Sequence, residues 1–375
     1  MPPPVVVIGG GVVGAAVLHA LTRRGVPALL LEAGPALGLQ ASGTNSGILH
    51  TGFDSKPGEL ETQLILASVA LRPELHAELG ITELRCGAVM TPRDNTESGA
   101  VTALADNARR NGVSVDVDGE GRLHVPGEWV CDPVDYVLRL AGSAVQAGAV
   151  VRTGCRVTGL RPADGGLDVE VVGEHDVRAT AVVNCAGLRA DEVARMAGDD
   201  HIDVYPRKGV FVVFRPDRAL PEIRLPVPSP GTKGVLLFPT IDGHVIAGPT
   251  AEDLEDKDDW SATPASVARL TAQAMTLAGD LELGPVVGAY AGLRPAGRGT
   301  NYLVGASPTM PGVVHAAAIR STGLSASLGI AEHVVGLVAE TGVPLGATRP
   351  LPPPAAGVQE LAWWRRTARH VSVAA

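Results

Sequence analysis

A glycine-rich turn between two short apolar runs constrains the fold of this chain more than any other feature. Residues 5–8 read VVVI, which is typical of a strand buried on both faces of a parallel sheet. The turn GGGVVG at 9–14 follows, then a helix-like run that ends at Gly25 and a second apolar run, ALLLE, at 28–32. This order of strand, turn, helix, strand and acid predicts a dinucleotide-binding βαβ unit.

Each glycine of the turn has a physical task. Gly9 allows the tight turn, Gly11 lets the backbone approach a pyrophosphate, and Gly14 lets the helix pack close to the sheet. The helix that starts near Val13 offers free N–H groups and the positive end of its dipole to the phosphates. Glu32 ends the second run, where a carboxylate accepts hydrogen bonds from ribose hydroxyls and disfavours NADP. The unit therefore predicts FAD or NAD and does not separate the two.

The segment that follows Glu32 favours FAD. In an NAD dehydrogenase the second strand usually leads into another strand–helix repeat, whereas residues 33–52 contain no such repeat. Glycines and small polar residues fill the segment instead, so its backbone can run along an extended cofactor. The hydroxyl and amide groups that suit the ribityl–pyrophosphate chain and the isoalloxazine edge belong to Ser42, Thr44, Asn45 and Ser46.

Length and composition bound the class of protein. At 375 residues the chain exceeds what one core usually supports, so we expect two intertwined domains. A net charge of −9, without a basic patch interleaved with aromatics, argues against nucleic-acid binding. The four cysteines form no CxxC pair, so we expect no metal or iron–sulfur site. No apolar run approaches the ~18 residues of a membrane span, which predicts a soluble, cytoplasmic protein without a transmembrane segment.

The remaining pattern predicts two kinds of architecture. Helices are expected at 60–79, 97–111 and 131–149, short strands around the second of these between 83 and 130, and strands at 150–162, 167–172 and 177–187. Residues 203–250 alternate as antiparallel strands do. We expect the acidic segment 252–260 at the solvated surface. Arg207 and Lys208 are expected to be solvated charges at a strand end, with the substrate pocket as the alternative.

The predicted fold class is α/β, with a Rossmann-like FAD-binding domain and an intertwined antiparallel-sheet α+β substrate domain. Residues 1–82, 131–202 and 296–345 are assigned to the FAD-binding domain, 83–130 and 203–295 to the substrate domain, and 346–375 to a C-terminal tail. The cationic aromatic residues of this tail are expected to dock onto the protein itself, with a partner or a membrane surface as alternatives. They are Trp363, Trp364, Arg365 and Arg366.

Several short segments together resemble one family. SGTNSGILHTG (42–52), KPGELE (56–61), NCAG (184–187), AGLRP (291–295) and STGL (321–324) are similar to motifs of FAD-dependent oxidoreductases of the D-amino-acid oxidase superfamily, the glutathione-reductase-2 group. The nearest members are glycerol-3-phosphate dehydrogenase-like and L-2-hydroxyglutarate oxidase-like proteins. Some larger relatives continue into a Cys-rich iron–sulfur domain, and this chain has no cysteine after Cys185.

The resemblance implies further cofactor contacts. The backbone near Val157 would lie beside the adenine, and Ala186 and Gly187 would lie beneath the cofactor. The N–H groups of the turn at 321–324 would face the flavin O2 and the ribityl chain, where the helix dipole stabilises negative charge on the reduced flavin. The family pattern often has Arg at the position of Thr44. Cofactor-contacting residues implied in the second half of the chain are Arg294, Ser321, Thr322, Gly323 and Leu324.

The resemblance also implies a reaction. Oxidation of an alcohol carbon passes a hydride to flavin N5 and needs a base for the hydroxyl proton, which His50 could provide. The alternative is that His50 only hydrogen-bonds its loop or the flavin. Arg294 would grip the anionic group of the substrate, because a planar guanidinium suits a carboxylate or a phosphate. Further candidates for contact with the substrate are Lys208, Tyr290 and Arg320.

The predicted function is an FAD-dependent dehydrogenase or oxidase that acts on a C–OH group of a small anionic substrate. Glycerol 3-phosphate is the first candidate, and L-2-hydroxyglutarate or another 2-hydroxy acid is the second. An amine or amino acid is a third, and a non-catalytic flavin-binding subunit that relays electrons is the alternative of another class. Oxygen, a quinone and a protein all remain open as the electron acceptor.

Overall fold

The computed structural model describes residues 2–228, 234–355 and 362–368. Its centre is a six-stranded sheet with the order β20–β21–β13–β1–β2–β9, in which every pair is parallel except β20 with β21. The bounds of these strands are β1 (Val5–Ile8), β2 (Ala28–Leu31), β9 (Val150–Arg152), β13 (Ala181–Asn184), β20 (Leu303–Ala306) and β21 (Val313–Ala317).

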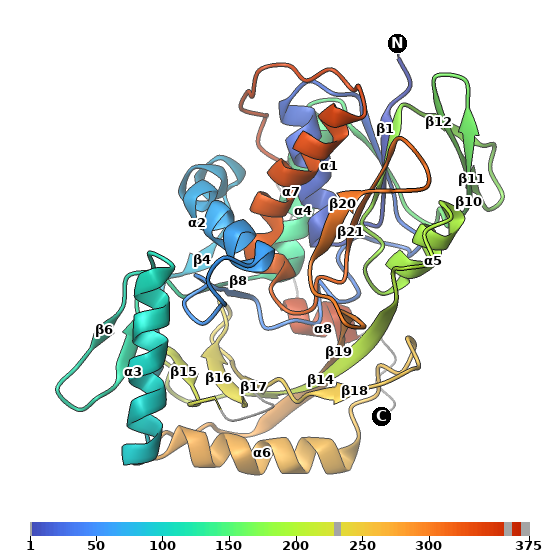
Figure 1. The fold of residues 1–375 in the computed structure, drawn as a ribbon. Coiled ribbons are helices and arrows are strands. Elements are labelled where there is room, and N and C mark those ends of the chain that lie inside the picture. The colour runs from blue at the N-terminus through green and yellow to red at the C-terminus, as the bar shows by residue number, and fades with distance from the viewer. Residues whose placement is uncertain (1, 229–233, 356–361, 369–375) are drawn as a thin grey trace.

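Two different layers cover this sheet. Four helices pack together on one face (Figure 1), namely α1 (Val12–Arg23), α2 (Leu60–Leu79), α4 (Pro133–Gln146) and α7 (Gly323–Glu340). The other face carries α5 (Ala190–Met196), which follows the short 3₁₀ helix η1 (Gly187–Arg189), and a three-stranded sheet of β10 (Val157–Ala163), β11 (Gly166–Val171) and β12 (Val177–Ala179). Val5 and Val7 of β1 belong to the helical core, whereas Val6 and Ile8 belong to the core beneath the three-stranded sheet. The run VVVI is apolar throughout because both faces of β1 are buried.

Two predicted strands prove to be two elements each. The segment 150–162 is divided between β9 in the central sheet and β10 in the three-stranded sheet, and 177–187 is divided between β12 and β13. The break in the second segment falls at Thr180, whose N–H donates to the carbonyl of Pro4 at 2.9 Å. The chain changes sheets at both points. Apolar periodicity cannot reveal this change because the residues on either side of the break are equally extended.

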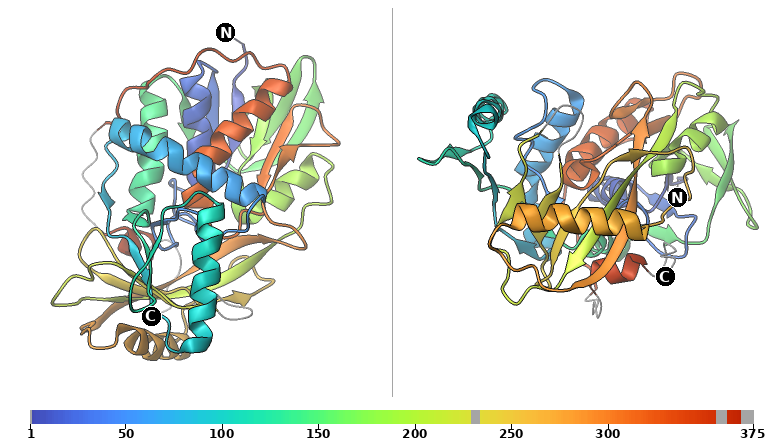
Figure 2. Two further views of the ribbon diagram at one scale, coloured as in Figure 1. Left: turned by 60° about the vertical axis from the view of Figure 1, so that its left-hand side comes forward. Right: turned by 90° about the horizontal axis from the view of Figure 1, so that it is seen from below.

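A second large sheet, with nine strands of mixed orientation, lies mainly in the segments predicted as the substrate domain, and we keep that name for them. Its order is β18–β14–β17–β16–β15–β5–β7–β6, with β19 also paired to β14, and β15 is parallel to β5. The bounds are β5 (Ala88–Met90), β6 (Asp116–Val117), β7 (Leu123–Val125), β14 (Val204–Phe214), β15 (Ile223–Leu225), β16 (Leu236–Pro239), β17 (Val245–Gly248), β18 (Glu252–Asp253) and β19 (Val286–Gly297). Helix α6 (Pro264–Ala278) crosses the outer face of the sheet and α3 (Asn95–Arg110) stands beside it (Figure 2).

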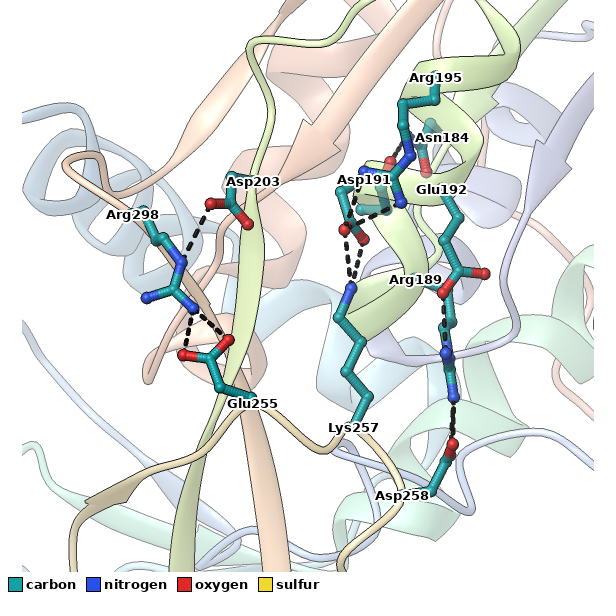
Figure 3. Close-up of polar contacts among 11 residues, drawn as sticks. Asn184, Arg189, Asp191, Glu192, Arg195, Asp203, Glu255, Lys257, Asp258 and Arg298 are labelled. Carbon is teal, nitrogen blue, oxygen red and sulfur yellow. Dashed lines mark hydrogen bonds and ion pairs between the residues drawn. The ribbon is translucent and has the colours of Figure 1, made fainter.

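The acidic segment 252–260 lies at the surface, as expected, and none of its residues is buried, but several of its charges are paired. After β18 it makes ion pairs with η1, α5 and the end of β19 (Figure 3). Lys257 Nζ lies 2.7 Å from Oδ1 of the buried Asp191 on α5, and Asp258 accepts from Arg189 at 2.7 Å. These contacts attach a loop of the substrate domain to the edge of the cofactor domain. A net-acidic run of letters does not indicate such pairing, because the partners lie about 40 to 70 residues away in sequence.

The described part of the tail docks onto the protein itself, as expected. Helix α8 (Trp363–Ala368) buries Trp363 and Trp364 in the hydrophobic core of the substrate domain. Arg366 pairs with Asp132, the N-cap residue of α4. Among the described residues, no helix combines the length and hydropathy that a membrane span requires.

Candidate functional site

Two adjoining cavities lie where the domains meet. The first has a volume of about 470 Å³ and extends from the glycine turn after β1 to the N-terminus of α7. The second has a volume of about 530 Å³ and extends into the substrate domain. Both are within the size range of small-molecule sites. The residues that line both are Ala41, Asn45, Ser46, His50, Arg294, Arg320 and Ser321.

The glycine turn has the close contacts that a dinucleotide cradle needs. Gly9 has a φ of +109°, and a Cβ there would lie 2.4 Å from the carbonyl oxygen of Cys185. A Cβ on Gly14 would lie 1.9 Å from the Gly9 carbonyl oxygen, so α1 can approach the sheet only with glycine at this position. Gly11 faces the cavity beside Ser42. Gly14 itself does not line the cavity, because its role is in this close packing.

Glu32 follows β2 and lines the first cavity. Its two carboxylate oxygens accept hydrogen bonds from the N–H groups of Gly10 and Gly34, each at 2.6 Å. A carboxylate has about four lone-pair sites, so acceptor capacity for a ribose hydroxyl is left on the cavity side. The two backbone hydrogen bonds hold the carboxylate in place beside the glycine turn.

The polar loop at 41–47 is folded by its own side chains. Asn45 Nδ2 donates to the Ser42 carbonyl at 2.5 Å, and its Oδ1 accepts from the Gly47 N–H at 2.6 Å. The hydroxyl of Ser42 accepts from the N–H of Val12 at 2.9 Å, which attaches the loop to the first turn of α1. Ser42 and Ser46 line the first cavity, and Thr44 lines the second.

The turn at 321–324 closes the opposite end of the first cavity. Ser321, Gly323 and Leu324 line it at the start of α7, and Ala186 and Gly187 line it from the end of β13. Thr322 lines the second cavity instead, and its hydroxyl donates to Glu61 Oε1 at 2.7 Å. The N-terminus of α7 therefore presents its free N–H groups to the cavity.

Besides Gly14, three predicted site residues lie away from both cavities. Val157 begins β10 and is buried in the core beneath the three-stranded sheet. Lys208 lies between Arg207 and Gly209, which line the second cavity, so strand alternation points it to the other face. Its ammonium pairs with Asp259 at 2.8 Å, and it is therefore not a solvated strand-end charge either. Tyr290 is buried against Phe211 and donates to the Asn45 carbonyl at 3.0 Å, so it supports the polar loop.

His50 lies at the junction of the two cavities. It follows β3 (Ile48–Leu49), and its N–H donates to the hydroxyl of Ser325 at 2.8 Å. Its Nδ1 lies 2.7 Å from Oε2 of Glu128. The side chain of His50 is 26% exposed and that of Glu128 is 0% exposed. Because Nδ1 is occupied by the carboxylate, Nε2 is the nitrogen available to the cavity.

Glu128 is the site residue that sequence reasoning missed. β3 pairs antiparallel with β8 (Trp129–Cys131), with Ile48 opposite Val130 and Leu49 opposite Trp129. The next pair in this register places Glu128 opposite His50. The second carboxylate oxygen, Oε1, accepts from the N–H and the hydroxyl of Thr51 at 2.6 and 2.8 Å. Glu128 meets His50 only because strands 78 residues apart pair, and no local sequence pattern indicates that contact.

Three guanidinium groups line the second cavity. Arg294 donates to the carbonyls of Arg207 and Thr250 at 3.1 and 2.9 Å. Burial, and then the charges of Arg207 and Arg320, lower the pKa of Arg294 to about 10. Among the described residues, the one carboxylate paired with any of the three is Asp253, at 3.5 Å from Arg207. Asp54 also lines this cavity, and the three guanidinium groups outnumber it, so the excess of positive charge favours a bound anion.

Comparison with known proteins identifies the family. Residues 4–337 match the family described as FAD dependent oxidoreductase (DAO). The chain belongs to this family. A glycerol 3-phosphate dehydrogenase of Caloramator mitchellensis is 26% identical to it, with 89% of this chain and 73% of that protein covered. The human mitochondrial L-2-hydroxyglutarate dehydrogenase is 27% identical, with 66% and 60% covered. The FAD-bound L-α-glycerophosphate oxidase of Mycoplasma pneumoniae has a TM-score of 0.85 at 25% identity, with 93% and 97% covered.

Membership in the DAO family confirms the predicted fold class, the FAD cofactor and the oxidoreductase activity. The residues around the first cavity fit this cofactor. The glycine turn leaves the backbone open where a pyrophosphate would lie, Glu32 stands at the end of β2, and the N-terminus of α7 faces the far end. The substrate is a separate question, which depends on the second cavity.

Proposed function

We propose that this chain oxidises a C–OH group of a small anionic substrate, with glycerol 3-phosphate as the first candidate. One observation carries the proposal. His50, whose Nδ1 is held by a fully buried carboxylate, lines the same cavity as Arg294 and Arg320. A base and an anion-binding group in one cavity are what the oxidation of an anionic alcohol requires. Similarity to the glycerol 3-phosphate dehydrogenase and the L-α-glycerophosphate oxidase supports the same substrate.

Different residues bind the substrate, accept its proton and position the base. Arg294 and Arg320 bind and orient the anionic group, which fixes the position of the substrate hydroxyl. Nε2 of His50 accepts the hydroxyl proton. Glu128 keeps the proton of the neutral ring on Nδ1 and stabilises the imidazolium that forms. It acts as a positioning residue, because its carboxylate hydrogen-bonds to His50 and Thr51 and lines neither cavity. FAD, when bound, supplies the hydride acceptor.

A 2-hydroxy acid such as L-2-hydroxyglutarate is the second candidate. It is favoured by the third guanidinium group, because Arg207 lines the same cavity as Arg294 and Arg320 and two carboxylates need more than one partner. An amine or amino acid is less well supported, since loss of a hydride from a C–N carbon does not need a strong base such as the His50–Glu128 pair. Electron relay requires neither a base nor an anion site, so the presence of both argues against an electron-relay subunit.

Anaerobic reduction of the flavin tests the proposal. The purified protein should be yellow, and glycerol 3-phosphate or L-2-hydroxyglutarate should bleach it. A His50→Asn variant should retain flavin and bleach at least about 10²-fold more slowly, because a general base contributes about 10² to 10⁴. Bleaching by amines alone would favour the amine alternative. A yellow protein that none of these compounds bleaches would overturn the proposal in favour of electron relay.

A further inference from the structure

The second cavity has a charged end and an apolar end. His50, Arg294 and Arg320 lie at the charged end, which adjoins the first cavity. Arg207 and Asp54 line only the second cavity. The apolar end consists of large apolar side chains that also line only this cavity. They are Phe53, Met90, Leu104, Phe211, Leu225 and Leu236.

The apolar wall is part of the packed core of the substrate domain. Phe53, Met90, Phe211 and Leu225 are 3%, 3%, 4% and 6% exposed and belong to one hydrophobic cluster. Met90, Phe211 and Leu225 come from strands β5, β14 and β15 of one sheet, which fixes their positions relative to one another, and Phe53 from the segment after β3 packs in the same cluster. Side chains held this way form a preformed surface, which is typical of a ligand site.

Neither small candidate substrate uses such a wall. Glycerol 3-phosphate and L-2-hydroxyglutarate carry polar or charged groups at both ends of the carbinol carbon. A phosphate or carboxylate placed against Phe53 or Met90 would lose its hydration without gaining a hydrogen bond, which is strongly unfavourable. Arg294 and Arg320, which would accept the anion, line the part of the cavity that is shared with the first cavity.

We infer that the apolar end receives a hydrocarbon substituent of the substrate. The substrate class is then an anionic alcohol whose carbinol carbon carries an aliphatic or aromatic group, for example a 2-hydroxy acid with an apolar side chain. The anion lies on Arg294, the hydroxyl on His50 Nε2, and the hydrocarbon group against Phe211 and Met90. This inference rests on the proposed function, because it assumes that the second cavity is where the alcohol is oxidised.

A chain-length series tests the inference. The reduction of the flavin is measured under anaerobic conditions with L-lactate, L-2-hydroxybutanoate, L-2-hydroxyhexanoate and L-3-phenyllactate, beside glycerol 3-phosphate and L-2-hydroxyglutarate. Each buried methylene should increase the apparent second-order rate constant about fourfold, which corresponds to the transfer free energy of one CH₂ group. Binding of non-oxidisable n-alkyl carboxylates, followed by the flavin spectrum, should tighten by a similar factor per methylene.

A matched pair of variants locates the effect. Leu104 lines the apolar end from α3, and Leu104→Gln should flatten the chain-length dependence of both rate and binding. Leu277→Gln on α6 changes a comparable half-buried leucine that lines neither cavity, so it should retain the full dependence. Circular dichroism and flavin content check that both variants are folded and loaded.

Different experimental results would refute the inference and the proposed function. A rate that is highest with glycerol 3-phosphate or L-2-hydroxyglutarate, with no gain along the series, would overturn the inference and leave the proposed function standing. Loss of flavin from Leu104→Gln, with the chain-length dependence unchanged, would assign the apolar wall to the cofactor and also overturn it. No reduction by any of these alcohols would overturn the proposed function itself.

Discussion

Replacing Glu128 with Gln tests the proposed base most sharply, because the two side chains have the same size and shape. The N–H and the hydroxyl of Thr51 both donate to Oε1 of Glu128. An amide at this position would keep its oxygen there and turn its NH₂ group toward Nδ1 of His50. Nδ1 would then have to accept a hydrogen bond, and the ring proton would move to Nε2, where it blocks proton acceptance.

The magnitude follows from the two interactions that change. A hydrogen bond to a charged group contributes about 1.5–3 kcal/mol and a neutral one about 0.5–1.5 kcal/mol, so loss of the carboxylate charge costs the protonated ring about 1–1.5 kcal/mol. Restoring the working tautomer breaks the new hydrogen bond at a further cost of about 1 kcal/mol. Together these cost about 2–2.5 kcal/mol, which corresponds to a decrease of about 30- to 70-fold in the rate of flavin reduction.

Anaerobic stopped-flow measurement with glycerol 3-phosphate across pH provides the assay, and Glu128→Ala is the comparison. If Glu128 only stabilises the loop, the isosteric Gln variant should react like the unmodified protein, and Ala should be the slower of the two. If Glu128 sets the tautomer and charge of His50, Gln should be slow although its thermal stability is retained. A Gln variant that reduces its flavin at an unchanged rate would refute the reasoning.

Three further predictions concern the cofactor, the anion and stability. Gly11→Val should give folded but colourless protein, because its side chain would occupy the place of the pyrophosphate beside Ser42, whereas Gly99→Ala, in open space on α3, should stay yellow by absorbance. Arg294→Ala should raise the KM for the anionic substrate by a factor that corresponds to about 2–5 kcal/mol of lost binding free energy. Arg298→Ala, which removes the ion pairs with Asp203 and Glu255, should leave this KM unchanged. If steady-state assays give the same KM for Arg294→Ala and the unmodified protein, Arg294 does not bind the anion. Burial lowers the pKa of His19 from 6.5 to about 4, so the unfolded chain binds more protons and stability falls as pH drops from 6.5 toward 4. His19→Gln should reduce the loss of unfolding free energy between pH 7 and pH 5 by about 2 kcal/mol in urea titrations, and parallel curves would contradict this.

Local sequence patterns predicted much of the cofactor domain. The helices at 60–79 and 131–149 were predicted from composition and from the Asp132-Pro133 start, and the structure places them at Leu60–Leu79 and Pro133–Gln146. The glycine turn and the acid after the second strand indicated the class of cofactor, because a tight turn, a close helix and a ribose-facing acid each demand one residue type at one position. Such demands act over a few neighbouring residues, so the sequence alone carries them.

The active-site chemistry depended on tertiary structure. The pairing of His50 with Glu128 follows from the register of β3 with β8, which joins segments 78 residues apart. The side of the strand from which Lys208 projects, and its ion pair with Asp259, also depended on how β14 lies in the sheet. The alternation of residues along a strand does not show which side chains face the cavity, because shifting the strand register by one residue exchanges the two faces. The sequence by itself therefore determined that an extended dinucleotide is bound. Only the assembled sheets decided which charges meet, because those contacts join residues that are far apart in the chain.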